Sequence, residues 1–132
     1  MKLQGKIILL DAWNTFVTED GIFKELQVVL DTFENKKIIV TNANQEQKVK
    51  FGIVDMPYEV FSLSHNPDKT DPDYFKKLFE HFSLSAKDVV YVEHNKDALK
   101  AAEFLGIKSW WYDKDAKDVE KVMEFLQENI SK

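Results

Sequence analysis

The chain has 132 residues with no cysteine and no arginine, and its 18 lysines against 23 acidic residues give a formal net charge of −5. That length fits one domain, which we expect to span residues 1–132. The missing cysteines exclude disulfides, thiolate nucleophiles and cysteine-based metal sites. The acidic balance argues against binding to nucleic acid or to anionic membranes. Because no apolar run is long enough to span a membrane and the first residues do not resemble a signal peptide, we expect a cytoplasmic protein.

Short apolar runs alternate with helical patterns along the chain, which predicts βαβ units and a parallel sheet. In the first half, continuous apolar runs predict strands over Lys6–Leu10 and Lys37–Val40, and alternation in Tyr58–Leu63 predicts a weaker third strand. Helical spacing of apolar residues predicts a helix over Gly21–Glu34 and a short one over Asn44–Phe51.

The second half continues the same alternation. Asp71-Pro72 is typical of a helix start, with Asp as the N-cap and Pro at the first helical position. We expect Trp110-Trp111-Tyr112 to pack in the core, although an exposed face there would suggest an oligomer interface. The sequence thus predicts a three-layer α/β domain with a mostly parallel sheet of about five strands. Its remaining elements are a strand at Val89–Val92, a helix at Asn95–Leu105, a strand at Ile107–Tyr112 and a helix from Asp115 or Ala116 to Ile130.

Polar residues follow the predicted strands, at the edge of the sheet where open α/β proteins bind ligands. A carboxylate at such a position can be a nucleophile, a metal ligand or the cap of a turn. Thr41 and Asn42 offer a hydroxyl and an amide for anionic oxygens, and Lys69 offers a charge that neutralises a carboxylate or a developing negative charge. The residues concerned are Asp11, Thr41, Asn42, Lys69, Glu93 and His94.

Four segments in this order resemble the motif series of the haloacid dehalogenase-like superfamily: KIILLDAWNTF, IIVTNAN, KTDPDYFKKL and VVYVEHNKDALKAAEFLGI. The resemblance covers roughly residues 6–112. It implies a Rossmann-like core and a strand-end aspartate that attacks, in most members, a phosphoryl group with the help of Mg²⁺. It also implies that Asp11 is the nucleophile, Thr41 the second-motif hydroxyl and Lys69 the third-motif lysine.

The first motif departs from the family pattern at Trp13. Phosphatases of the superfamily carry a second aspartate there as general acid and base, and its loss typically costs on the order of 10²–10⁴ in rate. An aromatic residue at this position is similar to the dehalogenase branch. That branch also has a halide-binding arginine and a cap over the site, whereas this chain has no arginine and only about 29 residues between Asp11 and Thr41. We therefore expect no cap domain and disfavour dehalogenation.

The fourth motif, Glu93–Asp97, can be aligned with the family in two registers. In one, Glu93 and Asp97 take the acidic positions; in the other, His94 replaces the first aspartate. We expect Mg²⁺ to bind Asp11, Glu93 and Asp97, together with the backbone carbonyl of Trp13. His94 and Asn42 are then candidates for substrate binding, and Trp13 either stacks on a substrate or plugs the site.

The leading hypothesis is a capless hydrolase of this superfamily that cleaves a phosphate ester through Asp11 with Mg²⁺. An uncapped site is open, so the resemblance favours a large or macromolecular phosphorylated substrate over a small metabolite. The alternative is a catalytically degenerate member that binds a ligand or a protein partner. A receiver-like signalling domain is a third possibility, but Asp11 lacks the acidic neighbour that such domains have.

Overall fold

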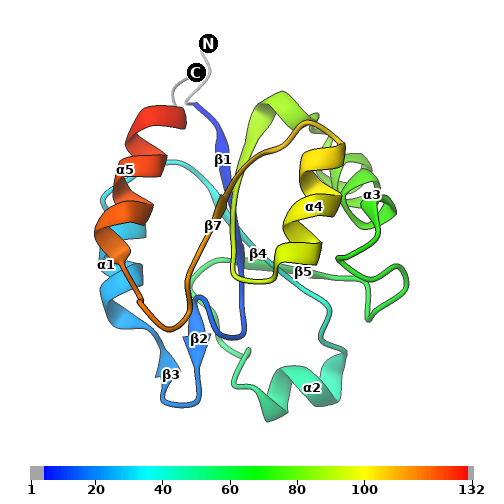
Figure 1. Ribbon diagram of the computed structural model, residues 1–132. Helices are drawn as coiled ribbons and strands as arrows, with labels where there is room; N and C mark the ends of the chain where they lie inside the picture. Colours follow the sequence, from blue (N-terminus) through cyan, green and yellow to red (C-terminus); the bar gives the residue numbers. More distant parts are fainter. Residues whose placement is uncertain (1–4, 131–132) are drawn as a thin grey trace.

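The computed structural model describes residues 5–130, which form a three-layer α/β domain. A sheet of parallel strands lies in the middle, with α1 and α5 on one face and α3 and α4 on the other (Figure 1). The strand order is β5-β4-β1-β6-β7, which puts β1 at the centre. This confirms the predicted Rossmann-like α/β class; the ends of the predicted 1–132 domain lie outside the described residues. The sheet strands are β1 (Ile7–Asp11), β4 (Lys37–Thr41), β5 (Glu59–Ser62), β6 (Val89–Glu93) and β7 (Lys108–Trp111).

The helices begin and end largely where local chemistry predicts. Asp71 caps the helix that starts at Pro72, and its side chain accepts the Asp73 N–H at 2.9 Å. Asn44 and Gln47 form a reciprocal capping box at the start of a short helix. The helices are α1 (Lys24–Asp31), α2 (Gln45–Lys50), α3 (Pro72–Phe82), α4 (Lys96–Phe104) and α5 (Val119–Asn129), with a 3-10 turn at Ala86–Asp88.

The two sides of each central strand feed two separate cores. On β1, Ile8 and Leu10 face α1 and α5, whereas Leu9 faces α3 and α4. Burial on both faces explains why β1, β4 and β6 read as continuous apolar runs rather than as alternating ones. Because β1 is packed on both faces, it holds the residue at its carboxyl end, Asp11, in a fixed position.

The predicted helix over Gly21–Glu34 is wrong at its start, where the structure has a β-hairpin. Strands β2 (Val17–Thr18) and β3 (Gly21–Ile22) pair antiparallel, and the helix begins only at Lys24. Gly21 has φ of +101°, a conformation that residues with a Cβ atom rarely adopt. This value is incompatible with an α-helix, so the helix cannot begin at Gly21. The hairpin projects from the carboxyl end of the sheet (Figure 1).

Two expectations near the C-terminal end are also corrected. The last helix begins at Val119 rather than at 115 or 116, because Asp113 accepts the N–H groups of Asp115 and Ala116 in a turn and Asp118 is the N-cap. The aromatic run is only partly core. Tyr112 is buried, but Trp111 is 43% exposed because β7 is an edge strand.

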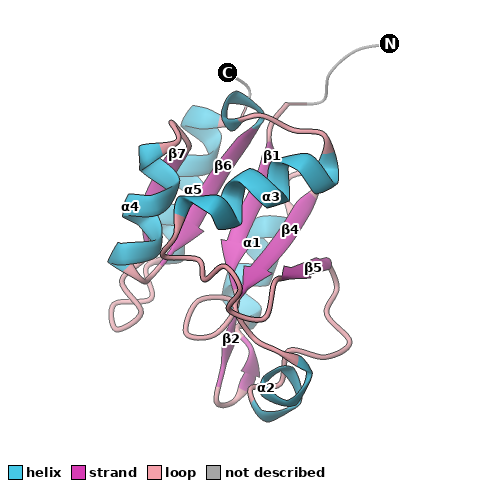
Figure 2. Ribbon diagram, turned by 90° about the vertical axis from the view of Figure 1, so that its right-hand side faces the viewer, coloured by secondary structure: helices cyan, strands magenta, loops and turns pink. Residues whose placement is uncertain are grey.

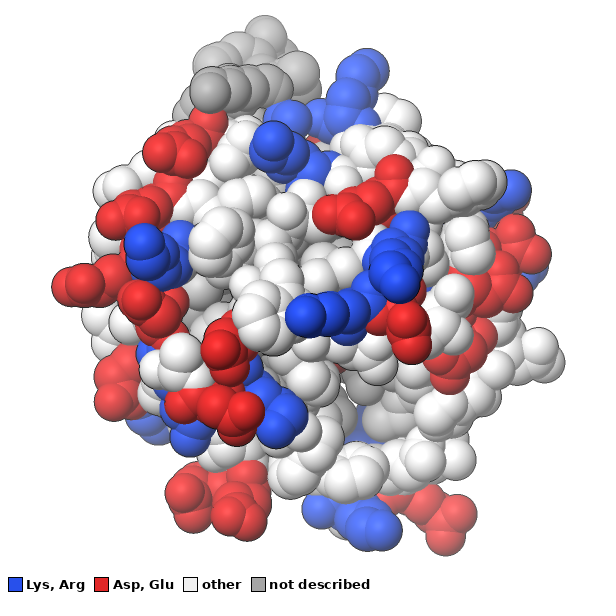
Figure 3. Space-filling model, viewed as in Figure 1, with Lys and Arg blue, Asp and Glu red and all other residues white. Residues whose placement is uncertain are grey.

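Within residues 5–130, no helix combines the length and the apolar character needed to cross a bilayer. Lysines and acidic residues are interspersed on the face drawn in Figure 3.

Candidate functional site

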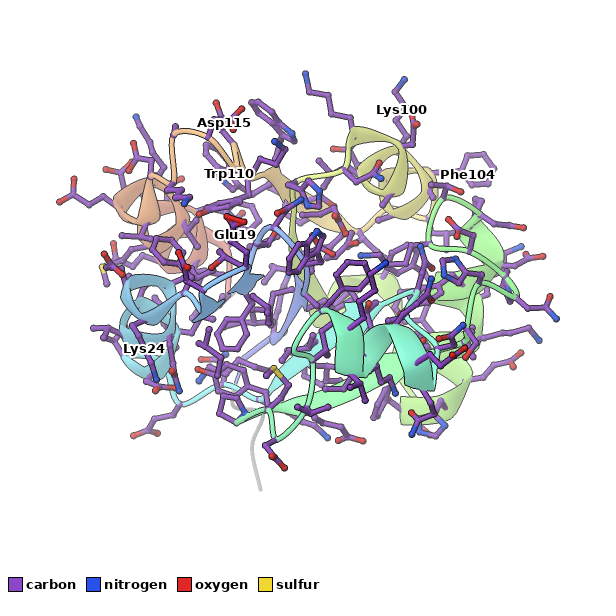
Figure 4. All side chains as sticks on the ribbon, turned by 90° about the horizontal axis from the view of Figure 1, so that it is seen from below. Glu19, Lys24, Lys100, Phe104, Trp110 and Asp115 are labelled. Atoms are coloured by element: carbon purple, nitrogen blue, oxygen red, sulfur yellow. The ribbon has the colours of Figure 1, made fainter. Side chains whose placement is uncertain are left out.

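The carboxyl ends of three neighbouring strands converge on a pocket of about 170 Å³. Asp11 is the last residue of β1, Thr41 the last of β4 and Glu93 the last of β6, as expected for polar residues that follow parallel strands. The short helix α2 lies beyond this end of the sheet, apart from the four helices of the outer layers (Figure 2), and is nearest the viewer in Figure 4. The pocket, which is partly open to solvent, is lined by Gln47 of α2 as well as by the residues at the strand ends.

Lys69 links the two carboxylates at the floor of the pocket. It comes from the loop before α3, and its Nζ donates to Asp11 Oδ1 at 2.6 Å and to Glu93 Oε1 at 2.7 Å. A third contact, at 3.2 Å, goes to the carbonyl oxygen of Val40. All three charged side chains are buried, with side-chain exposures of 7% for Lys69, 6% for Asp11 and none for Glu93. Buried charges at this separation need one another, because each alone would lose its hydration without compensation.

His94 contacts the opposite side of the same carboxylates. Its Nδ1 lies 2.5 Å from Asp11 Oδ2 and 3.5 Å from Glu93 Oε2. The hydroxyl of Thr15 donates to Asp11 Oδ2 at 2.9 Å. Both oxygens of Asp11 are thus hydrogen-bonded, which fixes the orientation of the carboxylate. His94 itself is held through its backbone, whose carbonyl oxygen accepts the Trp111 Nε1–H at 2.8 Å.

The surroundings of the two carboxylates shift their pKa values in opposite directions. Burial alone would raise the pKa of Asp11, but the Lys69 ammonium and the His94 hydrogen bond outweigh it and hold that pKa well below its usual range. Burial, together with repulsion from Asp11, raises the pKa of Glu93 to about 7. Asp11 is therefore ionised at neutral pH while Glu93 titrates near it.

The two cations of the cluster are stabilised in their charged forms. Burial opposes the charge of Lys69, but the carboxylates of Asp11 and Glu93 outweigh burial and raise its pKa. The same competition raises the pKa of His94, because its hydrogen bond to Asp11 outweighs partial burial. Tyr91 donates a hydrogen bond to Glu93 Oε1, and the backbone N–H of Asn95 reaches Glu93 Oε2 at 3.1 Å. No group of the cluster is left without partners.

Thr41 and Asn42 line the pocket as the sequence predicts, and both also shape its walls. The Asn42 side-chain oxygen accepts the backbone N–H of Lys69 at 2.8 Å, so Asn42 fixes the lysine. Thr41 Oγ1 accepts the Ala43 N–H at 3.2 Å. The buried hydroxyl of Tyr74 holds the Thr41 backbone, accepting its N–H at 3.1 Å.

Trp13 forms part of the pocket wall. Its ring lies against that of Phe51, with centroids 4.7 Å apart and planes tilted by 43°. The pocket also includes Gln47 and His65, which are joined by a 3.0 Å contact. Sequence reasoning missed Thr15 and Phe51. The position of Thr15 four residues after Asp11 is a weak signal, and nothing local in the sequence indicates that Phe51 reaches this site.

The structure leaves one predicted ligand outside the site. Asp97 is exposed in the first turn of α4, and its backbone N–H bonds the Asn95 side chain. The carboxylates and imidazole that come together are those of Asp11, Glu93 and His94, each of which offers an atom within 4.8 Å of the others. His94, predicted for substrate binding, lies in this group.

No family model and no curated protein matches the chain. Several solved structures resemble it in fold. An uncharacterized protein from Corynebacterium glutamicum superposes with a TM-score of 0.60 at 15% identity, over 92% of this chain and 95% of that one. An L-2-haloacid dehalogenase superposes with a TM-score of 0.61 at 18% identity, over 80% of this chain but only 54% of its own. At such identities the likeness shows the fold alone: the chain has a Rossmann-like α/β fold that resembles that of the L-2-haloacid dehalogenase.

Proposed function

We propose that the protein is a hydrolase that cleaves a phosphate ester, with Asp11 as its nucleophile. The observation that carries the proposal is the environment of Asp11: an ionised carboxylate at the end of the central strand, oriented by Lys69 and His94 and lining an open pocket. A carboxylate nucleophile divides a difficult displacement into two easier steps.

In the first step, an Asp11 oxygen attacks phosphorus, the bond to the leaving oxygen breaks, and that oxygen departs with the electron pair. The product is an aspartyl-phosphate, which water hydrolyses to regenerate Asp11 and release phosphate. Lys69 stabilises the negative charge as it spreads over the phosphoryl oxygens, and Thr41 and Asn42, which line the same pocket, offer a hydroxyl and an amide to these oxygens.

A divalent cation fits the donor set of this site. Asp11 and Glu93 provide the carboxylate oxygens that Mg²⁺ prefers, and we propose Mg²⁺ as the first ion to test. With both carboxylates ionised and Lys69 protonated, the three side chains carry one net negative charge, which repels a phosphate. When bound, the cation reverses that charge and polarises the phosphoryl group.

The open pocket supports a bulky substrate. Its volume of about 170 Å³ suffices for a phosphoryl group and little more, so most of the substrate would remain outside. We propose that the site is uncapped and that it acts on a phosphate group carried by a large or macromolecular substrate. The dehalogenase similarity does not add a halide site, since this chain has no arginine.

Hydrolysis of a generic aryl phosphate, with and without Mg²⁺, tests the proposal. An aryl leaving group departs without much protonation, so the assay reports the nucleophile directly. Asp11→Asn should lower turnover by at least ~10³-fold, whereas Asp97→Asn, which changes an exposed carboxylate outside the pocket, should leave it within about twofold. Full activity of the Asp11 variant would refute the proposal.

A binding protein without catalysis is the second candidate, and Trp13 is the observation that favours it. In the resembling phosphatases this position carries the general acid, whereas here an indole lies against Phe51 at 4.7 Å. Calorimetry with orthovanadate, a phosphate analogue, separates the candidates. Tight binding without turnover of any aryl phosphate would favour the binding protein, and binding with turnover that requires Asp11 would favour the hydrolase.

A further inference from the structure

The carboxylate pair at the floor of the pocket has two chemically different sides. Lys69 Nζ occupies one side, bonding Asp11 Oδ1 and Glu93 Oε1 at 2.6 and 2.7 Å. The imidazole of His94 faces the other, with Nδ1 at 2.5 Å from Asp11 Oδ2 and 3.5 Å from Glu93 Oε2. The second side therefore combines two oxygen donors and one nitrogen donor.

We infer that this second side is a transition-metal site in which His94 is a ligand alongside Asp11 and Glu93. Mg²⁺ takes oxygen ligands and keeps several waters, whereas imidazole suits Zn²⁺, Co²⁺ and related ions. The inference refines the choice of cation for the proposed hydrolase, for which Mg²⁺ is the first ion to test, and it rests on that function for the role of the cation in turnover. The existence of the metal site rests only on the side chains of Asp11, Glu93 and His94.

The spacing of the donors suits a single ion. Metal bonds to imidazole nitrogen and carboxylate oxygen are about 2.0–2.2 Å long, so adjacent ligands on one ion lie roughly 3 Å apart. The His94–Glu93 separation of 3.5 Å meets this with little movement, and the His94–Asp11 separation of 2.5 Å must open by about half an ångström. In holding an ion, Asp11 and His94 would give up their hydrogen bond to each other.

The ligands are held in place before any ion arrives. Thr15 donates to Asp11, the Asn95 N–H donates to Glu93 Oε2, and Trp111 holds the carbonyl of His94. Contacts of this kind around the ligands orient them and raise metal affinity. All three ligands also line the pocket, which gives an ion a route from solvent.

Lys69 does not compete for the same oxygen atoms. It bonds Oδ1 and Oε1, whereas the imidazole side presents Oδ2 and Oε2, so the ammonium remains paired when an ion binds opposite it. Its positive charge limits the affinity through repulsion, which the two carboxylates reduce because together they offset two of the three positive charges of the ammonium and a divalent ion.

Direct metal titration of the chelator-treated protein tests the inference without substrate. Co²⁺ binding is followed by its visible absorption, which reports nitrogen and oxygen ligation, and Mg²⁺ binding by calorimetry. His94→Ala should weaken Co²⁺ binding by at least ~10–100-fold, change the absorption spectrum, and alter Mg²⁺ affinity by less than about threefold. The matched control is His65→Ala, which removes the other imidazole lining the pocket and should change neither affinity.

A higher affinity for Co²⁺ than for Mg²⁺ is not enough to support the inference, because nearly all sites with nitrogen and oxygen ligands bind Co²⁺ more tightly. The deciding result is the dependence on His94, and unchanged Co²⁺ affinity and spectrum in His94→Ala would overturn the inference. If thermal unfolding shows that this variant is poorly folded, His94→Asn replaces it. The Asn variant should lower the ratio of Co²⁺ to Mg²⁺ affinity, and an unchanged ratio would overturn the inference equally.

The two proposals fail in different ways. Co²⁺ binding that requires His94, without any hydrolysis of aryl phosphates, would refute the proposed function and leave the metal site standing. Mg²⁺-dependent hydrolysis that requires Asp11, with Co²⁺ binding indifferent to His94, would refute the metal site alone.

Discussion

Replacing Lys69 by methionine tests the electrostatic account of the site. The substitution keeps an unbranched apolar side chain of similar length and removes only the ammonium. It deletes the contacts at 2.6 and 2.7 Å and leaves Asp11 and Glu93, both almost fully buried, side by side with the partly buried His94 as the cationic partner that remains. One of the two carboxylates must then take up a proton or draw water into the fold.

The expected cost follows from the burial of the pair. Removing one partner of a buried ion pair typically costs about 3–5 kcal/mol of unfolding free energy. For a domain of this size, that is a fall of roughly 10–20 °C in melting temperature. The loss should be smaller at pH 5 than at pH 8, because protonation of the carboxylates relieves their repulsion at the lower pH.

Urea unfolding followed by circular dichroism at both pH values measures the effect. The matched control is Lys76→Met, since Lys76 pairs with Asp73 at 3.7 Å on the surface of α3, where both side chains are about 60% exposed. Such pairs contribute at most about 1 kcal/mol. If Lys69→Met were no more destabilising than Lys76→Met, the carboxylates would not depend on the lysine and the reasoning would be refuted.

Two other substitutions test neighbouring parts of the site. The pKa of Glu93 is raised from 4.5 to about 7, so the stability it contributes is fully present below pH 4.5 and is lost as the pH rises through 7. Relative to Glu93→Gln, the wild-type unfolding free energy should fall across that window, and parallel pH profiles would contradict this. Tyr74→Phe should cost about 1–3 kcal/mol, because the hydroxyl is within 3.1 Å of the Thr41 N–H and within 3.0 Å of the carbonyl oxygens of Thr41 and Phe61. Thermal unfolding measures this loss of unfolding free energy. A loss below about 0.5 kcal/mol, which is the range of surface substitutions, would contradict the prediction.

The α/β class was predictable because its signals are local. Strands buried on both faces appear as runs such as KIILL and KIIV, and Asp71-Pro72 marks a helix start through its own backbone chemistry. The hairpin before α1 was not predictable in this way. Its strands have only two residues each, too few to establish a period, and Phe23 continues the helical spacing although it lies before the helix.

The site was predictable as a location and less so as a set of contacts. The rule that the carboxyl ends of parallel strands lie at one edge of the sheet correctly predicts that Asp11, Thr41 and Glu93 come together. It cannot decide which side chain of Glu93–Asp97 points inward, because that depends on where α4 begins. Asn95 caps α4, so Asp97 falls on its exposed first turn while His94 remains at the strand tip.

The central position of β1 has a consequence for the order in which the chain acquires its structure during synthesis. The strand that carries Asp11 leaves the ribosome before its two neighbours in the sheet, β4 and β6, and before its charged partners, residues 69 and 94. A nascent chain that stops before β6 has an unpaired strand edge in the middle of its sheet and a carboxylate lacking its imidazole. The central strand of the sheet therefore acquires both of its neighbours only after the chain as far as β6 has been synthesised.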